Sequence, residues 1–223
     1  MNAIVPPVSL TSILNPTFDS SQITKEELDL THISEPGKLA YLLHNVFTPE
    51  ECENLIKTSE AAGYSEALVH IGGGRQVLMK GYRDGSRVMI DDTEFVACLL
   101  QRISSHLPAT FADESLLEIN ERLRFLRYDE GDQFQPHSDA SYGRPDNSAR
   151  TLITLQIYLN ENFEGGETTF LPRRGDRATK SVPVVPKTGM ILVFEHNILH
   201  EGSLVKGGRK YTIRTDVLYT MTN

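Results

Sequence analysis

A histidine and an aspartate two positions apart, His137 and Asp139, are the first candidates for chemistry in this sequence. On an extended segment, residues i and i+2 point to the same side, so both side chains can reach one metal ion. A second histidine, His200, lies further along the chain, just before a Glu-Gly pair. Two imidazoles and one carboxylate can occupy one face of an octahedron and leave three positions open, which suits a non-haem iron(II) ion.

The His-x-Asp pair alone does not distinguish a metal site from a hydrogen-bonded histidine beside a loop aspartate, because the chain has seven histidines and 30 acidic residues. His196 is an alternative to His200, since it lies closer to the end of the preceding apolar stretch. His200 has the more suitable distance to Lys210, ten residues later. A lysine that returns beside the metal can pair with the far end of a bound dicarboxylate. The alternative is a surface lysine in the basic turn 206–210.

Arginines near these residues offer further contacts for an anion. Arg209 and Arg214 both flank Lys210 in sequence, but on a strand with period two only Arg214 shares its face. Arg214 can therefore line the same pocket, where it contacts substrate or closes an internal ion pair with Asp216. Arg150 precedes an apolar strand and either anchors a substrate or caps that strand at the surface.

Two loops are candidates for closing over a substrate, namely 72–85 and 140–150. The first contains Arg83, a candidate substrate-binding residue, and begins with three consecutive glycines at 72–74. These glycines predict a mobile hairpin or lid and not a phosphate-binding loop, because no Gly-Lys-Ser/Thr follows them. The arginines at 173, 174 and 177 are expected to be solvated.

Two helices are expected before the candidate site. Thr48-Pro49-Glu50-Glu51 has the form of a capping box with proline at the first helical position, and Gly63 is expected to end that helix. Asp91-Asp92 opens a second helix that continues toward Pro108. Their apolar faces are formed by residues at helical spacing, namely Cys52, Leu55 and Ile56 in the first helix and Phe95, Leu99 and Ile103 in the second.

From about residue 118 the pattern changes to short strands separated by turns, which predicts an α+β chain with a β-sandwich or barrel core. We expect residues 1–38 to be an N-terminal extension and 39–223 a single domain, with its β core at about 118–220. The chain length of 223 residues is sufficient for one substantial core. The expected strands are 123–128, 151–159, 168–171, 190–194 and 211–219.

Composition limits the class of protein. The net charge of −8 argues against a nucleic-acid partner, and no apolar run approaches the length of a membrane helix. The N-terminal residues lack the basic segment of a secretory signal. Cys52 and Cys98 each lie in a helical apolar pattern, which predicts free thiols and a reducing, cytoplasmic compartment, with the nucleus left open. The oligomeric state is left open too.

Several segments, in order and at matching spacing, resemble the catalytic domain of the prolyl 4-hydroxylase-type Fe(II)/2-oxoglutarate-dependent dioxygenases. The resemblance covers about residues 118–220 and extends more weakly back to the first capped helix. It implies a double-stranded β-helix, or jelly-roll, core with supporting N-terminal helices. The matching segments are Arg127-Tyr128-x-x-Gly131, His137-x-Asp139, Tyr158-Leu159-Asn160, Gly165-Gly166-Glu167-Thr168-x-Phe170, Pro186-Lys187-x-Gly189, His200-Glu-Gly202 and Gly208-x-Lys210-Tyr211.

The resemblance implies that His137, Asp139 and His200 bind Fe(II). It implies that Lys210 pairs with the C5 carboxylate of 2-oxoglutarate, assisted by the hydroxyls of Tyr128 and Tyr158. From the residues alone, either tyrosine can instead be a packing aromatic. The implied reaction uses O2, releases succinate and CO2, and hydroxylates an unactivated C–H bond, with ascorbate supporting turnover. The implied substrate is a prolyl residue in a peptide or protein.

Two departures from the family pattern leave the substrate open. Tyr211 stands where collagen-type enzymes have tryptophan, and the segment between Phe194 and His200 is short. One alternative is hydroxylation of a free amino acid or small metabolite. Another, from a different class, is a non-catalytic jelly-roll module that binds a metal or ligand. A nucleobase demethylase is disfavoured by the acidic balance and the lack of a second correctly spaced arginine.

Overall fold

The computed structural model describes residues 9–33, 37–70, 75–172 and 180–221. The first helix, α1 (Pro49–Ala62), begins at the predicted capping box. The Thr48 hydroxyl accepts a hydrogen bond from the Glu51 amide at 3.1 Å, and the Glu51 carboxylate accepts from the Thr48 amide at 2.8 Å. Gly63 ends the helix with φ 84°, a backbone conformation that favours glycine. Both predicted ends of α1 are confirmed.

The second helix, α2 (Thr93–Ile103), is capped by Asp92, whose carboxylate accepts from the Phe95 amide at 2.9 Å. It ends before the predicted stop at Pro108, because a 3-10 turn, η3 (Ser104–His106), follows directly. Both cysteines are free, as predicted. Neither described helix has the length and hydropathy needed to cross a membrane.

Most strands belong to one large antiparallel sheet, with β18 at its centre. The second half of β18 pairs with β8 (Glu114–Ile119), which also pairs with β7 (Thr110–Phe111). In spatial order the other strands are β1 (Thr24–Glu27), β2 (Ala40–His44), β15 (Ile191–Glu195), β11 (Ala149–Tyr158), β18 (Arg209–Thr220), β9 (Arg122–Asp129), β6 (Ser86–Asp91) and β3 (Ser65–Glu66).

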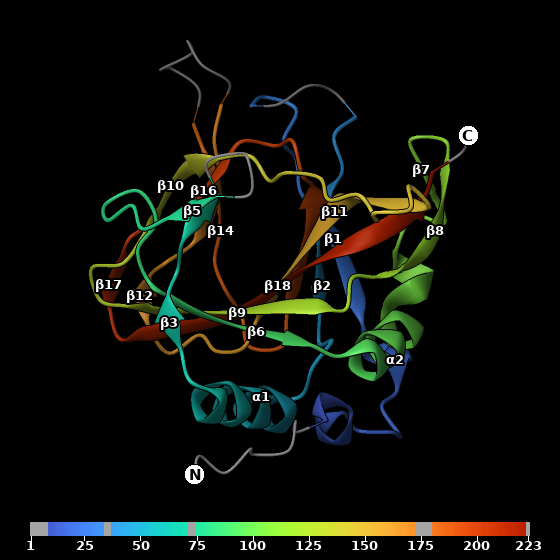
Figure 1. Ribbon diagram of the computed structural model, residues 1–223, viewed down its shortest axis with the longest axis horizontal. Helices are drawn as coiled ribbons and strands as arrows, with labels where there is room; N and C mark the ends of the chain where they lie inside the picture. The colour runs from blue at the N-terminus through green and yellow to red at the C-terminus, as the bar shows by residue number, and fades with distance from the viewer. Residues whose placement is uncertain (1–8, 34–36, 71–74, 173–179, 222–223) are drawn as a thin grey trace.

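A second antiparallel sheet has four strands and faces the large one. Two short ladders join the loops around it. Figure 1 shows α1 and α2 beneath the large sheet, with β10 and β16 on the side away from the helices. The four strands, in spatial order, are β10 (Phe134–His137), β16 (His200–Gly202), β13 (Thr168–Phe170) and β14 (Val182–Val184); the ladders are β12 (Glu164–Gly165) with β17 (Val205–Gly207), and β4 (Val69–His70) with β5 (Gln76–Val77).

The period of two in the strands separates two apolar layers. One face of the large sheet packs against the helices through residues such as Tyr41, Leu155 and Ile213, which meet Leu55 and Phe95. The other face packs against the small sheet through a second buried cluster. That cluster includes Leu42, Tyr158, Phe170, Leu192 and Phe194. The site residues lie on this second face, between the sheets, and the predicted α+β architecture is confirmed.

The described part of the predicted N-terminal extension is built onto the domain. It contains the short 3-10 helices η1 (Leu10–Ile13) and η2 (Ser20–Gln22) and the edge strand β1. Leu10 is fully buried, and the Asn15 amide donates to the Glu51 carboxylate at 2.7 Å. Residues 72–74 of the predicted lid at 72–85 lie outside the described residues, as do the arginines at 173, 174 and 177. The strands β4 and β5, on either side of the glycines, pair antiparallel.

Candidate active site

Three side chains from the small sheet and its flanking loop come together as the sequence predicts. His137 ends β10, and His200 begins β16 directly opposite it. The spacing argument assumed that His137 and Asp139 share one extended segment. In the structure, Asp139 lies two residues beyond the end of β10. Its position is instead held by its backbone amide, which donates to the His196 carbonyl at 2.8 Å.

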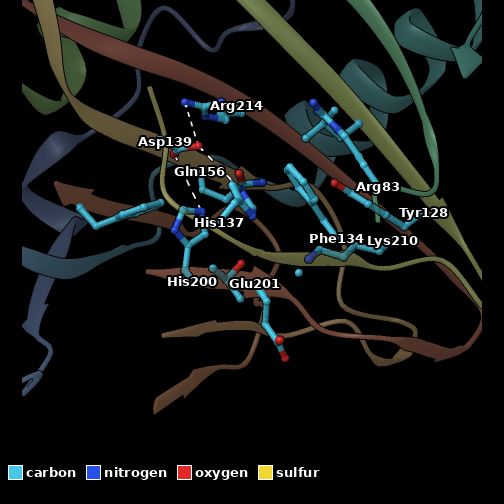
Figure 2. A pocket seen from close by; sticks show the side chains of 14 residues that line it. Arg83, Tyr128, Phe134, His137, Asp139, Gln156, His200, Glu201, Lys210 and Arg214 are labelled. Carbon is cyan, nitrogen blue, oxygen red and sulfur yellow. Dashed lines mark ion pairs between the residues drawn. The ribbon is translucent and has the colours of Figure 1, made fainter. Parts of the chain in front are cut away.

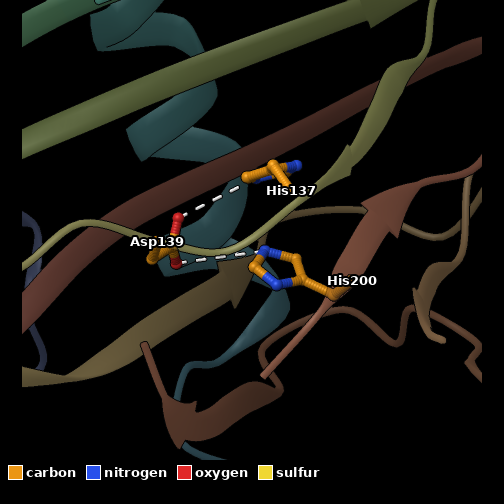
Figure 3. A group of neighbouring side chains, drawn as sticks. All are labelled: His137, Asp139 and His200. Atoms are coloured by element: carbon orange, nitrogen blue, oxygen red, sulfur yellow. Dashed lines mark ion pairs between the residues drawn. The ribbon is translucent and has the colours of Figure 1, made fainter. Parts of the chain in front are cut away.

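The three side chains point toward one another. The Nε2 atoms of His137 and His200 lie 3.8 and 3.9 Å from the two carboxylate oxygens of Asp139 (Figure 3). One nitrogen or oxygen from each residue can be chosen so that all three atoms lie within 4.8 Å of one another. This spacing allows one small cation to contact all three side chains.

The two imidazoles are oriented as metal ligands require. Nδ1 of His137 lies 2.8 Å from the Gln135 carbonyl oxygen, and Nδ1 of His200 lies 2.9 Å from the Ile198 carbonyl oxygen. A carbonyl only accepts, so each Nδ1 carries the hydrogen and each Nε2 presents a lone pair toward Asp139. Burial, with a smaller contribution from His200, lowers the pKa of His137 to about 3. Both the geometry and the neutral imidazole fit a divalent metal ion.

The carboxylate of Asp139 is held by two further groups. The Thr154 hydroxyl donates to Oδ2 at 2.7 Å, and a terminal guanidinium nitrogen of Arg214 lies 3.1 Å from Oδ1. Burial alone raises the pKa of Asp139, but the charge of Arg214 and the two imidazoles together lower it well below its usual range. The group is therefore ionised, as a metal ligand must be.

His196, the alternative to His200, does not join this cluster. Its Nδ1 lies 2.8 Å from the Thr154 hydroxyl and its Nε2 lies 3.0 Å from the Thr151 hydroxyl. Because Thr154 donates its own hydrogen to Asp139, it accepts one from Nδ1 of His196. His196 therefore supports Asp139 through Thr154.

Lys210 returns to the same region on β18, where it lies opposite Tyr128 of β9. Its ammonium donates to the Gly166 carbonyl at 2.6 Å and lies 5.5 and 5.7 Å from the ring centroids of Tyr128 and Tyr158. The residue is only 4% exposed, and burial lowers its pKa to about 8. Among the described residues it forms no ion pair. Arg209 points to the other face and pairs with Asp129, as period two predicts.

One pocket connects Lys210 with the three metal-binding candidates (Figure 2). Tyr128 lines it, whereas the hydroxyl of the fully buried Tyr158 donates to Thr168 at 2.7 Å and reaches the pocket only through that residue. Arg83 and Arg214, two of the predicted substrate-binding residues, also line the pocket. Arg150 does not lie there, because it pairs with Glu114 at 2.8 Å near the start of β11.

The sequence did not predict Gln156 and Phe134, which line the pocket, or Thr154, which holds Asp139. Gln156 and Thr154 lie on the same face of β11, where Gln156 is adjacent to Arg214 on β18. Their signal was present, since a polar residue at every second position interrupts an apolar strand. The ring of Phe134 stacks on His137 with centroids 3.6 Å apart, and nothing in the sequence pattern indicated that contact.

Comparison with known proteins agrees with this geometry. Residues 123–215 match the model of the 2OG-Fe(II) oxygenase superfamily. Probable prolyl 4-hydroxylase 8 of Arabidopsis thaliana is 26% identical over 61% of this chain and 46% of its own length, so this chain spans about half of that relative. Probable prolyl 4-hydroxylase 10 of the same plant is 26% identical over 91% of this chain and 77% of its own length.

The fold also matches a solved structure. A prolyl hydroxylase from Trichoplax adhaerens, in complex with a hypoxia inducible factor oxygen degradation domain peptide fragment, superposes with a TM-score of 0.60. The two proteins are 16% identical, over 80% of this chain and 82% of the other, so this match concerns the fold alone. The core is therefore the predicted jelly roll.

The part of the chain that carries the candidate site, residues 123–215, is similar to the 2OG-Fe(II) oxygenase superfamily. Over most of its length the chain is a distant homologue of prolyl 4-hydroxylases. Fe(II) and 2-oxoglutarate are implied as its metal and cosubstrate by the family and by the two histidines and the aspartate.

Proposed function

We propose that this enzyme hydroxylates an unactivated C–H bond of a prolyl residue in a peptide or protein, with 2-oxoglutarate converted to succinate and CO2. The observation that carries the proposal is the position of Lys210. It is a buried cation without an ion-pair partner among the described residues, and it lines the same pocket as the metal-binding candidates. A dicarboxylate spanning that pocket would supply the missing counter-charge.

In this proposal His137, Asp139 and His200 hold Fe(II), which supplies the activation of O2 when it is bound. Lys210 fixes the C5 carboxylate of 2-oxoglutarate, and the Tyr128 ring covers its ammonium. Tyr158 acts through Thr168, whose hydroxyl accepts its hydrogen bond and lines the pocket. The surrounding burial limits the access of water to the reacting groups.

The choice of a prolyl substrate is supported by the names of the two distant relatives described above, both of which are called probable prolyl 4-hydroxylases. A free amino acid or small metabolite is the second candidate. It is favoured by the two arginines, Arg83 and Arg214, in a pocket that needs only one cation for 2-oxoglutarate. A non-catalytic module is not proposed, because the three metal-binding candidates and Lys210 line one pocket.

Further features of the proposal follow from composition and burial. Two free cysteines support a reducing, cytoplasmic compartment. The net charge of −8 supports a partner other than nucleic acid. Ascorbate is expected to sustain turnover by keeping the iron reduced.

The experiment that tests this function incubates the purified protein with Fe(II), ascorbate, 2-oxoglutarate and a pool of proline-containing peptides. Succinate is measured together with mass increases of one oxygen atom in the peptides, and His137→Ala is the control variant. We expect succinate and hydroxylated peptide with the native protein only. A hydroxylated peptide that also forms with His137→Ala is not its product, and no succinate from any pool would refute the proposal.

A further inference from the structure

The pocket has a second basic end that the binding of 2-oxoglutarate does not use. Arg83 and Arg214 lie at the top of the pocket in Figure 2, and Lys210 lies below Phe134. Lys210 and Arg214 are four residues apart on β18, and four residues of an extended strand span about 13 Å. The charge of Lys210 at one end of the pocket is therefore well separated from that of Arg214 at the other.

Arg83 enters the pocket beside β10, where its backbone bridges to Phe134 and its guanidinium lies 4.7 Å from the centroid of that ring. The one hydrogen bond of its guanidinium to a described residue runs from a terminal nitrogen to the Leu68 carbonyl at 3.3 Å. Its Nε is buried without an acceptor, and no carboxylate of the described residues pairs with it. Burial lowers the pKa of Arg83, and the charge of Arg214 lowers it further.

Arg214 is only partly neutralised. One terminal nitrogen is shared between Asp139 and Asp216, at 3.1 Å from each, and its Nε is buried without an acceptor. Asp216 also accepts from Arg124 at 3.0 Å, so its charge is divided between two arginines. With a divalent ion and dianionic 2-oxoglutarate bound, the charges of Asp139 and Lys210 are balanced. The guanidinium groups then keep an excess of positive charge.

Arg83 and Arg214 both line this end of the pocket, and each keeps a guanidinium N–H without an acceptor. Guanidinium groups are well suited to bind a carboxylate. We propose that the hydroxylated substrate carries a free carboxylate held by Arg83 and Arg214. The oxidised carbon then belongs to a free amino acid or to the carboxy-terminal residue of a peptide, and not to an internal residue. This inference rests on the proposed oxygenase function.

The reaction balances with reagents already named. One atom of O2 enters the C–H bond of the substrate as a hydroxyl group, and the other enters succinate as 2-oxoglutarate loses CO2. The carboxylate of the substrate is unchanged. It serves to place the reacting C–H bond, in the same way that fixed contacts orient reactants in other enzymes.

The test compares three sets of probes with the native enzyme, Fe(II), ascorbate and 2-oxoglutarate. The first set is the free L-amino acids, the second is peptides ending in proline as free acids, and the third is the same peptides as amides. We expect hydroxylation of a free acid, with a kcat/KM about 10- to 100-fold above that of the matching amide. Hydroxylation in the first set identifies a free amino acid as the source of the carboxylate. Hydroxylation in the second set alone identifies the carboxy terminus of a peptide.

Two variants connect that preference with the arginines. Arg83→Gln and Arg214→Gln are expected to raise KM for the acid and to reduce the preference for acid over amide. Arg83→Gln touches none of the metal-binding candidates, so it should change the affinity for 2-oxoglutarate in Mn(II)-loaded protein by no more than about twofold. Arg122→Gln, which removes a half-exposed arginine paired with Asp91, is the matched control and should change neither quantity.

Equal activity on acids and amides would overturn the inference, as would activity on internal prolyl peptides alone. The same holds if Arg83→Gln weakens 2-oxoglutarate binding while the preference for acids persists. If the protein binds Mn(II) and 2-oxoglutarate but hydroxylates none of the free acids, the proposed carboxylate site would be refuted. The proposed oxygenase function would not be. A protein that does not bind 2-oxoglutarate at all would instead contradict the function itself.

Discussion

At the scale of single residues, the molecule buries a lysine that forms no ion pair among the described residues. The ammonium of Lys210 is enclosed by two tyrosine rings and donates to a backbone carbonyl, and its pKa falls to about 8 from an ordinary 10.5. A bound carboxylate favours the charged form, so its binding raises that pKa. Binding of 2-oxoglutarate is therefore linked to the protonation of this residue.

From this linkage we predict that the affinity for 2-oxoglutarate falls as the pH rises above about 8, by about tenfold per pH unit at the limit. Above that pH, the free protein must take up a proton to bind the ligand. Calorimetric titration of Mn(II)-loaded protein between pH 7 and 9.5, in two buffers of different ionisation enthalpy, measures both effects. In Lys210→Met we expect about 10- to 100-fold weaker binding without the proton uptake. An affinity that is independent of pH in the native protein would contradict this role for Lys210.

Thr154 is the residue whose hydroxyl connects His196 with the Asp139 carboxylate. We predict that Thr154→Val weakens metal binding by about 10- to 100-fold, because outer hydrogen bonds hold ligand side chains in place. Thr169→Val is the control, since it removes a comparable hydrogen bond, to Ser203, that does not involve Asp139. Mn(II) affinity is the measurement, and an equal loss in both variants would show that Thr154 has no special role.

Some residues of the candidate site could be predicted from the sequence and others could not. His137 and Asp139 are close in sequence, so their spacing alone suggested a site. Thr154 and Gln156 come from a strand whose apolar neighbours drew attention to packing. Arg150 was predicted either to anchor a substrate or to cap its strand at the surface. Its partner Glu114 is on β8, and no local pattern reveals a pairing between distant strands.

At the scale of elements, the turn at Gly165-Gly166 places the carbonyl that Lys210 contacts. Gly165 has φ 72°, and a Cβ there would lie 2.3 Å from the Leu204 carbonyl oxygen. Glycine is required at this position for both reasons. The turn therefore depends on a close approach between the segments of β12 and β17.

We predict that Gly165→Ala lowers the free energy of unfolding by about 1–3 kcal/mol and weakens 2-oxoglutarate binding, because the strained turn shifts Gly166. Gly143→Ala is the matched control, because a Cβ at Gly143 would meet no atom within 4 Å and the φ of this residue is not positive. Urea denaturation of both variants, followed by titration with 2-oxoglutarate, checks the prediction. Equal stability of the two variants would show that the turn tolerates a Cβ.

The elements themselves followed the sequence where their signals are local. Capping residues and the adjacent amides make the start of each helix a local event, so Thr48 and Asp92 were predicted correctly. The strand β10 was harder, because only four residues pair and Asp139 lies past its end. A contact with the His196 backbone fixes that aspartate, and such a contact depends on the complete fold.

At the scale of the whole molecule, an ion pair between α1 and α2 anchors the N-terminal segment. The side chains of Arg102 and Glu51 are 5% and 4% exposed, and a terminal guanidinium nitrogen of Arg102 lies 2.9 Å from a carboxylate oxygen of Glu51. Arg102 also donates to the Val46 carbonyl, and the Glu51 carboxylate accepts from the Asn15 amide. One buried pair thus connects both helices with residues that precede the catalytic core.

We predict that Arg102→Met lowers the free energy of unfolding by about 3–5 kcal/mol, because it leaves the Glu51 carboxylate buried and unpaired. The double variant Arg102→Met with Glu51→Gln should recover part of that loss. Chemical denaturation is the measurement. A single variant as stable as the native protein would mean that the pair does not hold the helices together.

The order of strands in the large sheet is the part of the fold that the residues alone could not give. β1 and β2 complete that sheet from before the predicted core, and β6 and β3 extend its other edge. These pairings join segments that are far apart in the chain. The family resemblance supplied the jelly roll, whereas period two on β18 correctly placed Lys210 and Arg214 on one face.

The central claim is that His137, Asp139 and His200 hold a metal ion that, with Lys210, binds 2-oxoglutarate. Its most direct test is equilibrium dialysis with Mn(II) in place of Fe(II), with and without 2-oxoglutarate. We predict one Mn(II) per chain, tight 2-oxoglutarate binding only in its presence, and loss of both in Asp139→Asn and His200→Ala. His196→Gln should still bind one ion, although more weakly. Retention of full Mn(II) binding by Asp139→Asn and His200→Ala would contradict the account.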